Sequence, residues 1–328
     1  IFIRNEGRND MARQFYYQMQ WPRDSLFVSC YAHELYNYRY HWHDSDYELD
    51  ILLKGKGEFC SGQNTYYMEE NDVILINPKV WHASFSQEEN SKSLVLRFSE
   101  SAFRSLLGKD ERLHFDLPPS DAATRDGEIY RKLRYYAARL LAAMGQKGPF
   151  QKLTARSSFE MFLSTLCDLN PAVEMISDPN KKSREIIDRL MKFIEQHWAE
   201  KLSLEDIAQY THYNRTYVST LFKNAVGINF HDYLTKVRLS NAIFQLAVTD
   251  KNMTQIALDC GFSDLKTFNH RFRDIFGYLP AEYKQRLDPA QVMQLQGQQV
   301  YVSPQDPSVA AKLAEYMDVW RGDGKSAP

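Results

Sequence analysis

The pattern of apolar and polar positions divides the chain into a strand-rich part and a helical part. Between residues 24 and 98, short segments such as "YELDILLKG" and "DVILINP" alternate apolar with polar residues and are separated by turn formers. These segments are rich in aromatic and β-branched residues, which favour strands. The pattern predicts an antiparallel β-sandwich or barrel within residues 1–110.

Helical spacing replaces this alternation after residue 110. One helical run ends near Met144, a second extends from Leu153 to Leu169, and "GQKGP" separates the two. The apolar positions of the first run are Ile129, Leu133, Tyr136, Leu140 and Met144. This spacing predicts a helical hairpin over residues 111–170.

Two further segments frame a second helical region. Residues 171–183 contain two prolines and several polar turn formers, so we expect an interdomain linker there. Residues 287–328 form a glutamine-rich C-terminal extension beyond that region. Within it, apolar residues from Val309 to Trp320 recur at helical spacing, and we expect this amphipathic helix to dock on the protein's own surface.

The helical region contains an internal repeat. The segments "SLEDIAQYTHYNRTYVSTLFKNAVG" and "NMTQIALDCGFSDLKTFNHRFRDIFG" follow one pattern. The matching pairs are Ile207 with Ile256, Ala208 with Ala257, Val218 with Phe268, Phe222 with Phe272, and Gly227 with Gly277. A repeated unit of helix, tight turn and helix predicts a duplicated helix-turn-helix.

The second helix of each unit has one apolar and one polar face. The residues expected on the polar faces are Arg215, Thr216, Ser219, Thr220 and Lys223 in the first unit, and Leu265, Lys266, Asn269, His270, Arg271 and Arg273 in the second. Such faces can enter a major groove and bond base edges. A merely solvated face is the alternative for any single residue, and it is a weak explanation for both helices together. Because the first helix offers short side chains, its readout would depend more on DNA shape.

These motifs, in their order, resemble the DNA-binding domain of the AraC/XylS family of bacterial transcription regulators over residues 184–286. The resemblance implies two recognition helices joined by a long helix from about Phe230 to Val248, with Arg238 at the family's basic position. His212 stands where the family usually has glycine, whereas Gly261 keeps the glycine in the second unit. Because histidine tolerates a left-handed backbone better than most residues, we expect the first turn to be intact.

The strand-rich part resembles the cupin sandwich that this family uses for effector binding. "HWHDSDYELDILLKG" is similar to the first cupin motif and "NDVILINPKVWH" to the second. Metal-binding cupins hold their ion with residues of these two motifs. The resemblance therefore implies that His41, His43, Glu48 and His82 of this chain are ligands of iron, manganese, nickel or zinc, to which imidazole and carboxylate groups are suited. "PKVWH" departs from the metal-enzyme pattern, because it lacks the usual glycine and shortens the spacing before His82.

Three interpretations of this cluster stay open: a metal site, a set of polar residues that bond one another, and a pocket for an organic effector. We expect the organic effector, with a sugar as the candidate, because flat aromatic faces beside hydrogen-bonding groups suit carbohydrates. The residues expected to bind it are His41, Trp42, His43, Tyr47, Glu48, Tyr67, Trp81 and His82.

The hairpin over residues 111–170 resembles the family's dimerisation element. Its spacing near 3.5 residues would bury Leu133, Leu140 and Met144 against a partner. Packing of the hairpin on the chain's own sandwich is the alternative. A dimer would present four helix-turn-helix units to a repeat in DNA.

Composition and charge agree with a DNA-binding regulator. Residues 181–286 carry 16 Lys and Arg against 12 Asp and Glu, although the whole chain has a net charge of -2, so one domain is mildly basic. The sequence shows no apolar run long enough for a membrane span and no signal segment, and its four cysteines have no framework spacing. We therefore expect a soluble, cytoplasmic protein without membrane contact.

The sequence thus predicts an α+β multidomain protein with an N-terminal antiparallel β-sandwich (cupin or jelly roll), a helical hairpin and a C-terminal all-α double helix-turn-helix. We predict a homodimeric transcription activator that binds promoter half-sites in double-stranded DNA, contacts RNA polymerase and responds to an effector. We predict no enzymatic activity and no cofactor. The alternatives are a metal-dependent cupin enzyme with a helical appendage, and a constitutive DNA-binding regulator whose cupin only dimerises.

Overall fold

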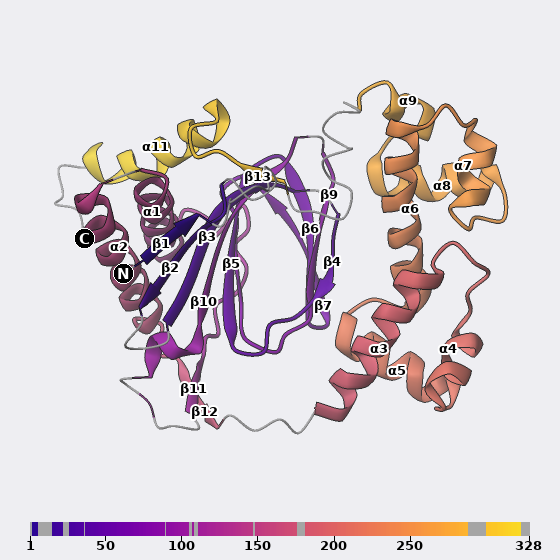
Figure 1. Ribbon diagram of the computed structural model, residues 1–328, viewed down its shortest axis with the longest axis horizontal. Helices are drawn as coiled ribbons and strands as arrows, with labels where there is room; N and C mark the ends of the chain where they lie inside the picture. The colour runs from indigo at the N-terminus through magenta and orange to yellow at the C-terminus, as the bar shows by residue number, and fades with distance from the viewer. Residues whose placement is uncertain are drawn as a thin grey trace.

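The protein consists of a β-sandwich, a layer of helices on one of its sheets and a helical domain beside the other, as Figure 1 shows. The computed structural model describes residues 2–5, 15–21, 26–35, 37–88, 90–104, 107, 111–146, 148–175, 181–287 and 300–322 of the 328-residue chain. This arrangement confirms the predicted fold class. None of the helices in these ranges is long and apolar enough to span a bilayer.

Two antiparallel sheets form the sandwich. The larger sheet has seven strands in the order β1-β2-β3-β10-β5-β8, with β13 also paired to β3. Its strands are β1 (Phe2–Asn5), β2 (Tyr17–Trp21), β3 (Leu26–Glu34), β5 (Asp46–Lys54), β8 (Val73–Ile76), β10 (Lys92–Ser99) and β13 (Tyr301–Val302). The smaller sheet, in the order β4-β9-β6-β7, consists of β4 (Asn37–His41), β6 (Lys56–Ser61), β7 (Asn64–Glu69) and β9 (His82–Ser86).

Alternate residues of the larger sheet face its two sides, as the period of a strand requires. On β5, Tyr47 and Leu49 belong to the apolar core beneath the helices, whereas Glu48 and Asp50 face the interior of the sandwich. The larger apolar core therefore lies between sheet and helices. The space between the two sheets holds a smaller apolar cluster, which includes Leu52, Phe59 and Ile74, and a polar cluster beside it.

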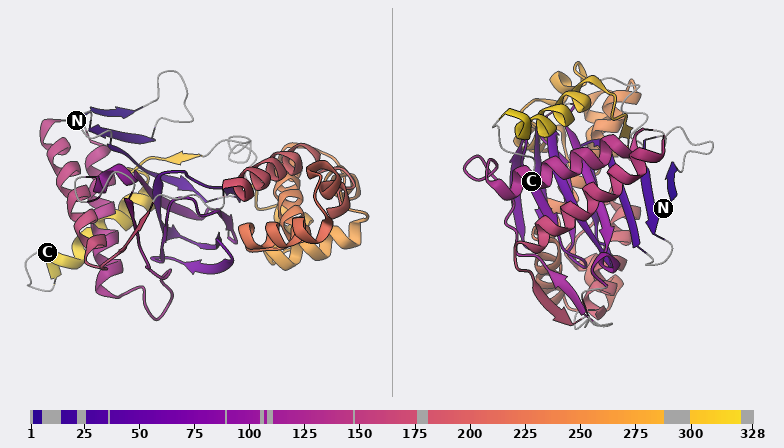
Figure 2. Two further views of the ribbon diagram at one scale, coloured as in Figure 1. Left: turned by 90° about the horizontal axis from the view of Figure 1, so that it is seen from below. Right: turned by 90° about the vertical axis from the view of Figure 1, so that its left-hand side faces the viewer.

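The helical hairpin consists of α1 (Glu128–Met144) and α2 (Pro149–Cys167), which cover the larger sheet (Figure 2). Leu133, Leu140 and Met144 are buried in the core that the hairpin shares with the sheet. The prediction that these three residues pack against a partner is therefore wrong. They pack on the chain's own sandwich, because their apolar stripe covers the outer face of the sheet.

Short elements connect the sandwich to the helical domain. The 3-10 helix η2 (Glu100–Phe103) follows β10, and β11 (Glu111–His114) pairs with β12 (Ala172–Met175). The first part of the predicted linker is therefore the strand β12, which forms a two-stranded sheet with β11. Residues 176–180 of the linker lie outside the described residues.

The helical domain contains the duplicated helix-turn-helix. Its helices are α3 (Lys181–His197), α4 (Leu204–Thr211), α5 (Arg215–Val226), α6 (Phe230–Val248), α7 (Met253–Asp259), α8 (Leu265–Phe276) and α9 (Pro280–Lys284). Asn214 and Asp264 cap the second helix of each unit through their side chains. His212 has φ +59° and Gly261 has φ +77°, so both turns use the left-handed backbone and the expectation of an intact first turn is confirmed.

The C-terminal extension returns to the sandwich. After β13, helix α11 (Pro307–Gly322) packs on α1, and its residues Val309, Leu313 and Tyr316 are buried. The Lys92 ammonium lies 2.9 Å from Asp306 Oδ1 and fixes the start of α11. The expectation that this helix docks on the protein's own surface is confirmed for its described side chains. The side chain of Trp320 lies outside them.

Candidate functional site

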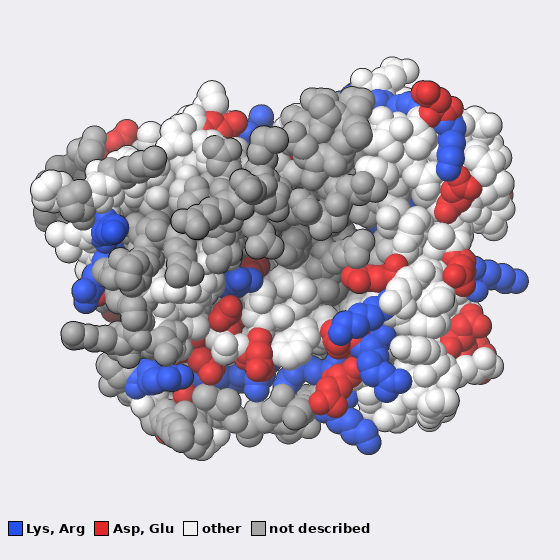
Figure 3. All heavy atoms as spheres, viewed as in Figure 1, with Lys and Arg blue, Asp and Glu red and all other residues white. Residues whose placement is uncertain are grey.

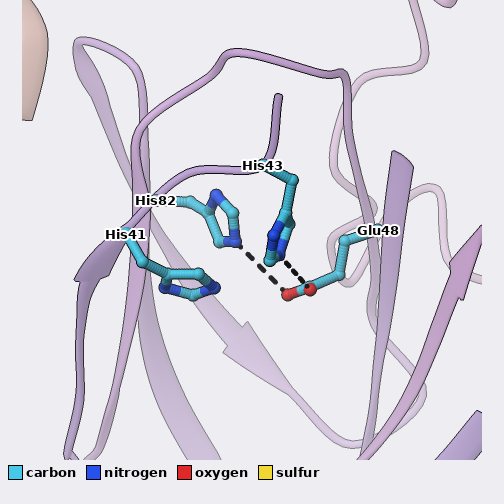
Figure 4. Close-up of side chains that lie close together, drawn as sticks. All are labelled: His41, His43, Glu48 and His82. Carbon is cyan, nitrogen blue, oxygen red and sulfur yellow. Dashed lines mark hydrogen bonds and ion pairs between the residues drawn. The ribbon is translucent and has the colours of Figure 1, made fainter. Parts of the chain in front are cut away.

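Four side chains converge between the two sheets, as Figure 4 shows: His41, His43, Glu48 and His82. His41 ends β4 and stands opposite His82 on the paired strand β9, while Glu48 reaches across from β5 in the other sheet. One nitrogen or oxygen from each residue lies within 4.8 Å of the corresponding atom of every other. The cluster predicted from the sequence is therefore assembled by the fold.

Glu48 is the centre of the cluster. Its Oε2 accepts a hydrogen bond from His43 Nε2 at 3.0 Å, and its Oε1 lies 3.3 Å from His82 Nε2. Burial acts to raise the pKa of Glu48, but the hydrogen bond from His43 and the nearby imidazoles of His82 and His41 outweigh burial and hold that pKa well below its usual range. The cluster therefore contains a buried carboxylate anion.

The hydrogen bond of His82 Nδ1 determines the tautomer of the neutral His82 ring. Because a carbonyl only accepts, Nδ1 donates its proton to the Val80 carbonyl at 3.0 Å. In the neutral ring Nε2 then carries a lone pair, and this buried atom makes no hydrogen bond within the described part of the chain. The 3.3 Å approach of Nε2 to the Glu48 carboxylate is favourable when a proton or a cation lies between the two atoms.

A second layer of polar residues supports Glu48 from the larger sheet. Burial raises the pKa of Asp50, and the charge and hydrogen bonding of Glu48 raise it further, so Asp50 stays protonated and donates to Glu48. Ser93 donates to Asp50 at 3.3 Å. Burial lowers the pKa of His33 to about 4, which keeps its imidazole neutral. Sequence reasoning missed Asp50 and His33, although Asp50 shares a strand face with Glu48.

The cavity beside the cluster is small. Its volume is about 10 Å³, close to the room that one water molecule needs. The residues that line it are Tyr31, His33, His41, Glu48, Asp50, Phe59, Cys60, Ile74, Ile76, His82, Ala83, Ser84 and Val95. A site of this size accommodates an ion or a water molecule, not a sugar ring.

The four aromatic residues predicted for the effector pocket do not line this cavity. Tyr47 points to the opposite side of β5 from Glu48, stacks on Phe98 and donates to the Leu113 carbonyl at 2.5 Å. Tyr67 on β7 is 70% exposed. Trp42 and Trp81 lie on the outer side of the smaller sheet, with ring centroids 6.1 Å apart. Alternation along the backbone explains three of these positions, because Trp42, Trp81 and Tyr47 are each adjacent in sequence to a residue that faces the interior.

The predicted DNA-facing residues are mostly exposed on α5 and α8. Arg215, Thr216, Thr220 and Lys223 of the first unit are exposed and Ser219 is half-buried. Around α8 an open groove is lined by Leu265, Lys266, Asn269, His270, Arg273, Asp274 and Leu279, and Arg271 is exposed beside it. On the face shown in Figure 3, basic and acidic side chains are interspersed over the helical domain.

Arg238 has a different position from the other predicted DNA contacts. Its guanidinium donates to the carbonyl oxygens of Trp198 at 2.8 Å and Glu200 at 2.7 Å. Burial lowers the pKa of Arg238. The side chain therefore ties α6 to the segment that follows α3, and its Nε and one Nη donate to the protein backbone.

Comparison with known proteins matches both halves of the chain. The family model of an AraC-like ligand-binding domain matches residues 28–163, and that of a helix-turn-helix domain matches residues 207–286. The chain belongs to the AraC family of transcription regulators. In this AraC-family protein, the ligand-binding match covers most of the sandwich and hairpin, and the helix-turn-helix match covers most of the second domain.

Individual relatives of this AraC-family protein are distant. An uncharacterised HTH-type transcriptional regulator of Staphylococcus aureus (strain COL) is 23% identical over 236 residues, which are 72% of this chain and 31% of that protein. A protein of Escherichia coli (strain K12) named as the HTH-type transcriptional regulator YkgA is 34% identical over 31% of this chain and 43% of its own length. The chain therefore spans 31% and 43% of the lengths of these two relatives.

Two solved structures illustrate the similarity to known proteins. A transcriptional regulator with an AraC-type DNA-binding domain from Chromobacterium violaceum is 32% identical over 34% of this chain and 98% of that chain, with a TM-score of 0.31. ToxT from Vibrio cholerae is 15% identical over 80% of this chain and 98% of that chain, with a TM-score of 0.36.

Proposed function

We propose that the protein is a transcription regulator that binds DNA through α5 and α8 and responds to a divalent transition-metal ion at His41, His43, Glu48 and His82. The observation that carries this proposal is the convergence of three imidazoles and one carboxylate within 4.8 Å, beside a cavity of about 10 Å³. Zinc, iron, manganese and nickel accept such mixed nitrogen and oxygen ligands.

The donor set fits an ion in distance and chemistry. Atoms bound at about 2.0–2.2 Å to one ion lie roughly 3 to 4.2 Å apart, so the cluster needs only a small contraction. His82 can supply Nε2 as one ligand, because its other ring nitrogen, Nδ1, bonds the Val80 carbonyl. At His43 the ion would replace the proton now donated to Glu48. The Val80 carbonyl orients the His82 ring, as carbonyl partners do for metal-bound histidines.

A sugar effector stays a prediction from the sequence. It requires the cavity to open well beyond about 10 Å³, and the aromatic residues expected to stack on it face elsewhere. Activation and contact with RNA polymerase also stay predictions, because both depend on partners.

For the homodimer we propose a surface on α2 in place of the stripe on α1. Phe150 is 77%, Leu153 is 66% and Met161 is 41% exposed on this helix. Large apolar side chains in such numbers on one helix favour contact with a second copy of the chain. Sedimentation of a Phe150→Asp, Leu153→Asp double variant tests this, and an unchanged mass would contradict it.

The experiment that tests the proposed function is a titration of labelled DNA from upstream of the protein's own gene. We expect fluorescence anisotropy to show a complex at low salt that weakens steeply as salt is added, because phosphate contacts dominate such binding. Zn²⁺, Fe²⁺, Mn²⁺ or Ni²⁺ added to chelator-treated protein should change the affinity or the footprint in the wild type but not in His82→Ala. Absence of any DNA complex, or an identical response in His82→Ala, would overturn the proposal.

A further inference from the structure

One hydrophobic core joins the sensor to the first helix-turn-helix unit. Buried residues Trp81, Ala83 and Phe85 of the smaller sheet pack in the same cluster as residues of α3 to α6. Figure 1 shows this sheet facing the helical domain. The outer face of the sheet is therefore a docking surface within the chain, and the second unit has a separate core.

An ion pair lies inside this interface. Lys236 of α6 places its ammonium 2.5 Å from Glu58 Oε1 of β6, and the two side chains are only 10% and 12% exposed. The same ammonium lies 4.4 Å from the centre of the Phe85 ring. Because a buried charge left without its partner is unfavourable, loss of either residue opposes docking.

The end of the first recognition helix touches the sensor directly. Gly227 follows α5 with φ +83°, and a Cβ there would lie 2.6 Å from the Gly62 carbonyl oxygen in the turn between β6 and β7. Only a residue without a side chain permits this approach. Docking therefore fixes the position of α5 relative to the sandwich.

The docking surface and the histidines of the candidate metal site lie on the same short backbone segments. Trp42 lies between His41 and His43, and Trp81 immediately precedes His82. The histidines point into the sandwich, while Trp42 and Trp81 pack on the helical domain, where the Arg184 guanidinium lies 5.5 Å from the centre of the Trp42 ring. A movement of the ligands toward an ion must therefore also move the two tryptophans.

We propose that metal occupancy of the cluster controls docking of the first helix-turn-helix unit on the sensor, through Trp42, Trp81 and the Lys236–Glu58 pair. This inference rests on the proposed metal response. The docked arrangement already gathers the four ligands, so it binds the ion more tightly than an undocked one. Coupling of two equilibria is reciprocal: the factor by which the ion favours docking is the factor by which docking favours the ion. A variant that populates the undocked state therefore loses metal affinity, up to that factor.

The test uses Lys236→Met in the full chain, since Lys236 lies on α6 and is not a metal ligand. Zn²⁺ affinity is measured by competition with a chromophoric chelator, and docking by acrylamide quenching of tryptophan, because Trp81 is only 5% exposed. We expect stronger quenching and a Zn²⁺ affinity reduced by about five-fold or more. Lys192→Met, which removes an exposed α3 ammonium paired with Asp188, is the matched control and should leave both readouts unchanged.

A charge swap, Glu58→Lys with Lys236→Glu, should restore the pair and with it much of the affinity. If Lys236→Met increases quenching while the Zn²⁺ affinity equals that of the wild type, the coupling is disproved and the proposed metal response survives. If quenching does not change, the ion pair does not hold the domains together and this inference fails. A wild type that binds no metal ion would overturn the proposed function and the inference together.

Discussion

His41 and His82 face each other across the paired strands β4 and β9, with their ring centroids 4.1 Å apart. Each is adjacent in sequence to a tryptophan of the domain interface, Trp42 or Trp81. A single strand pair therefore presents ligands to the interior and apolar rings to the DNA-binding domain. This relationship links the chemistry of the cluster to the position of α5.

Asp50 is predicted to position Glu48 through a donated hydrogen bond. Asp50→Leu removes the donor and should reduce metal affinity by about 10- to 100-fold, as loss of outer partners does at other metal sites. Asp50→Asn keeps an N–H donor and should largely restore the affinity. Chelator competition measures both variants. Equal affinities for the leucine and asparagine variants would contradict the positioning role.

Asn269 and Arg238 are predicted to differ in their effects on DNA binding. We propose that Asn269 of α8 reads a base, so Asn269→Ala should cost about 1–3 kcal/mol at the preferred site and relax specificity there. Arg238→Met should instead lower the stability of the domain, because its donors hold the carbonyl oxygens of Trp198 and Glu200. Anisotropy with matched and mismatched duplexes, together with urea unfolding, separates the two. A specificity change in Arg238→Met with unchanged stability would refute this distinction.

His33 predicts a loss of stability on acidification. Its pKa is lowered by burial to about 4, from 6.5, so below pH 6.5 the unfolded chain binds a proton that the folded chain does not. The free energy of unfolding should therefore fall by up to about 1.4 kcal/mol per pH unit between pH 6.5 and 4. In chelator-treated protein, His33→Gln should have a shallower pH slope than the wild type. His114→Gln, at a half-exposed histidine, is the control, and equal slopes for wild type and His33→Gln would count against the prediction.

The C-terminal helix is predicted to stabilise the sensor. Leu313 of α11 is 2% exposed against α1 and the sheet, so Leu313→Ala should cost about 2–5 kcal/mol. Glu315→Ala, one residue before Tyr316 on the solvent side, should cost little. Urea unfolding followed by near-ultraviolet dichroism measures both. A difference below about 0.5 kcal/mol between Leu313→Ala and the wild type would show that α11 is only loosely attached.

Local patterns explain which features could be predicted from the sequence. The helix-turn-helix units have helical spacing of apolar residues and cap residues such as Asn214 and Asp264. Because the pattern occurs twice in the chain, each unit supports the prediction of the other. His41, His43 and Glu48 lie within one short segment, so their meeting depends on local strand geometry. Tyr47 and Glu48 are adjacent on β5 and therefore face opposite sides of the sheet. The position of Tyr47 outside the site could thus have been predicted from the sequence.

Contacts between distant segments could not be predicted from the sequence. Lys236 and Glu58 are 178 positions apart, and no periodicity relates their elements. Leu133 and Leu140 are buried against the chain's own sheet and not against a second copy of the chain. An apolar stripe on a helix has the same sequence pattern in both cases, so the sequence could not distinguish them. The edge strand β12 was missed because its residues are exposed and follow a proline-containing segment.

The most direct test of the central claim is the metal content of full-length protein that carries no metal-affinity tag and is purified without chelator. Elemental mass spectrometry should find about one equivalent of a divalent transition metal per chain in the wild type and in His114→Ala, and almost none in His82→Ala. Retention of the same metal by His82→Ala would contradict the assignment of the site. So would a wild type that remains metal-free after dialysis against each candidate ion.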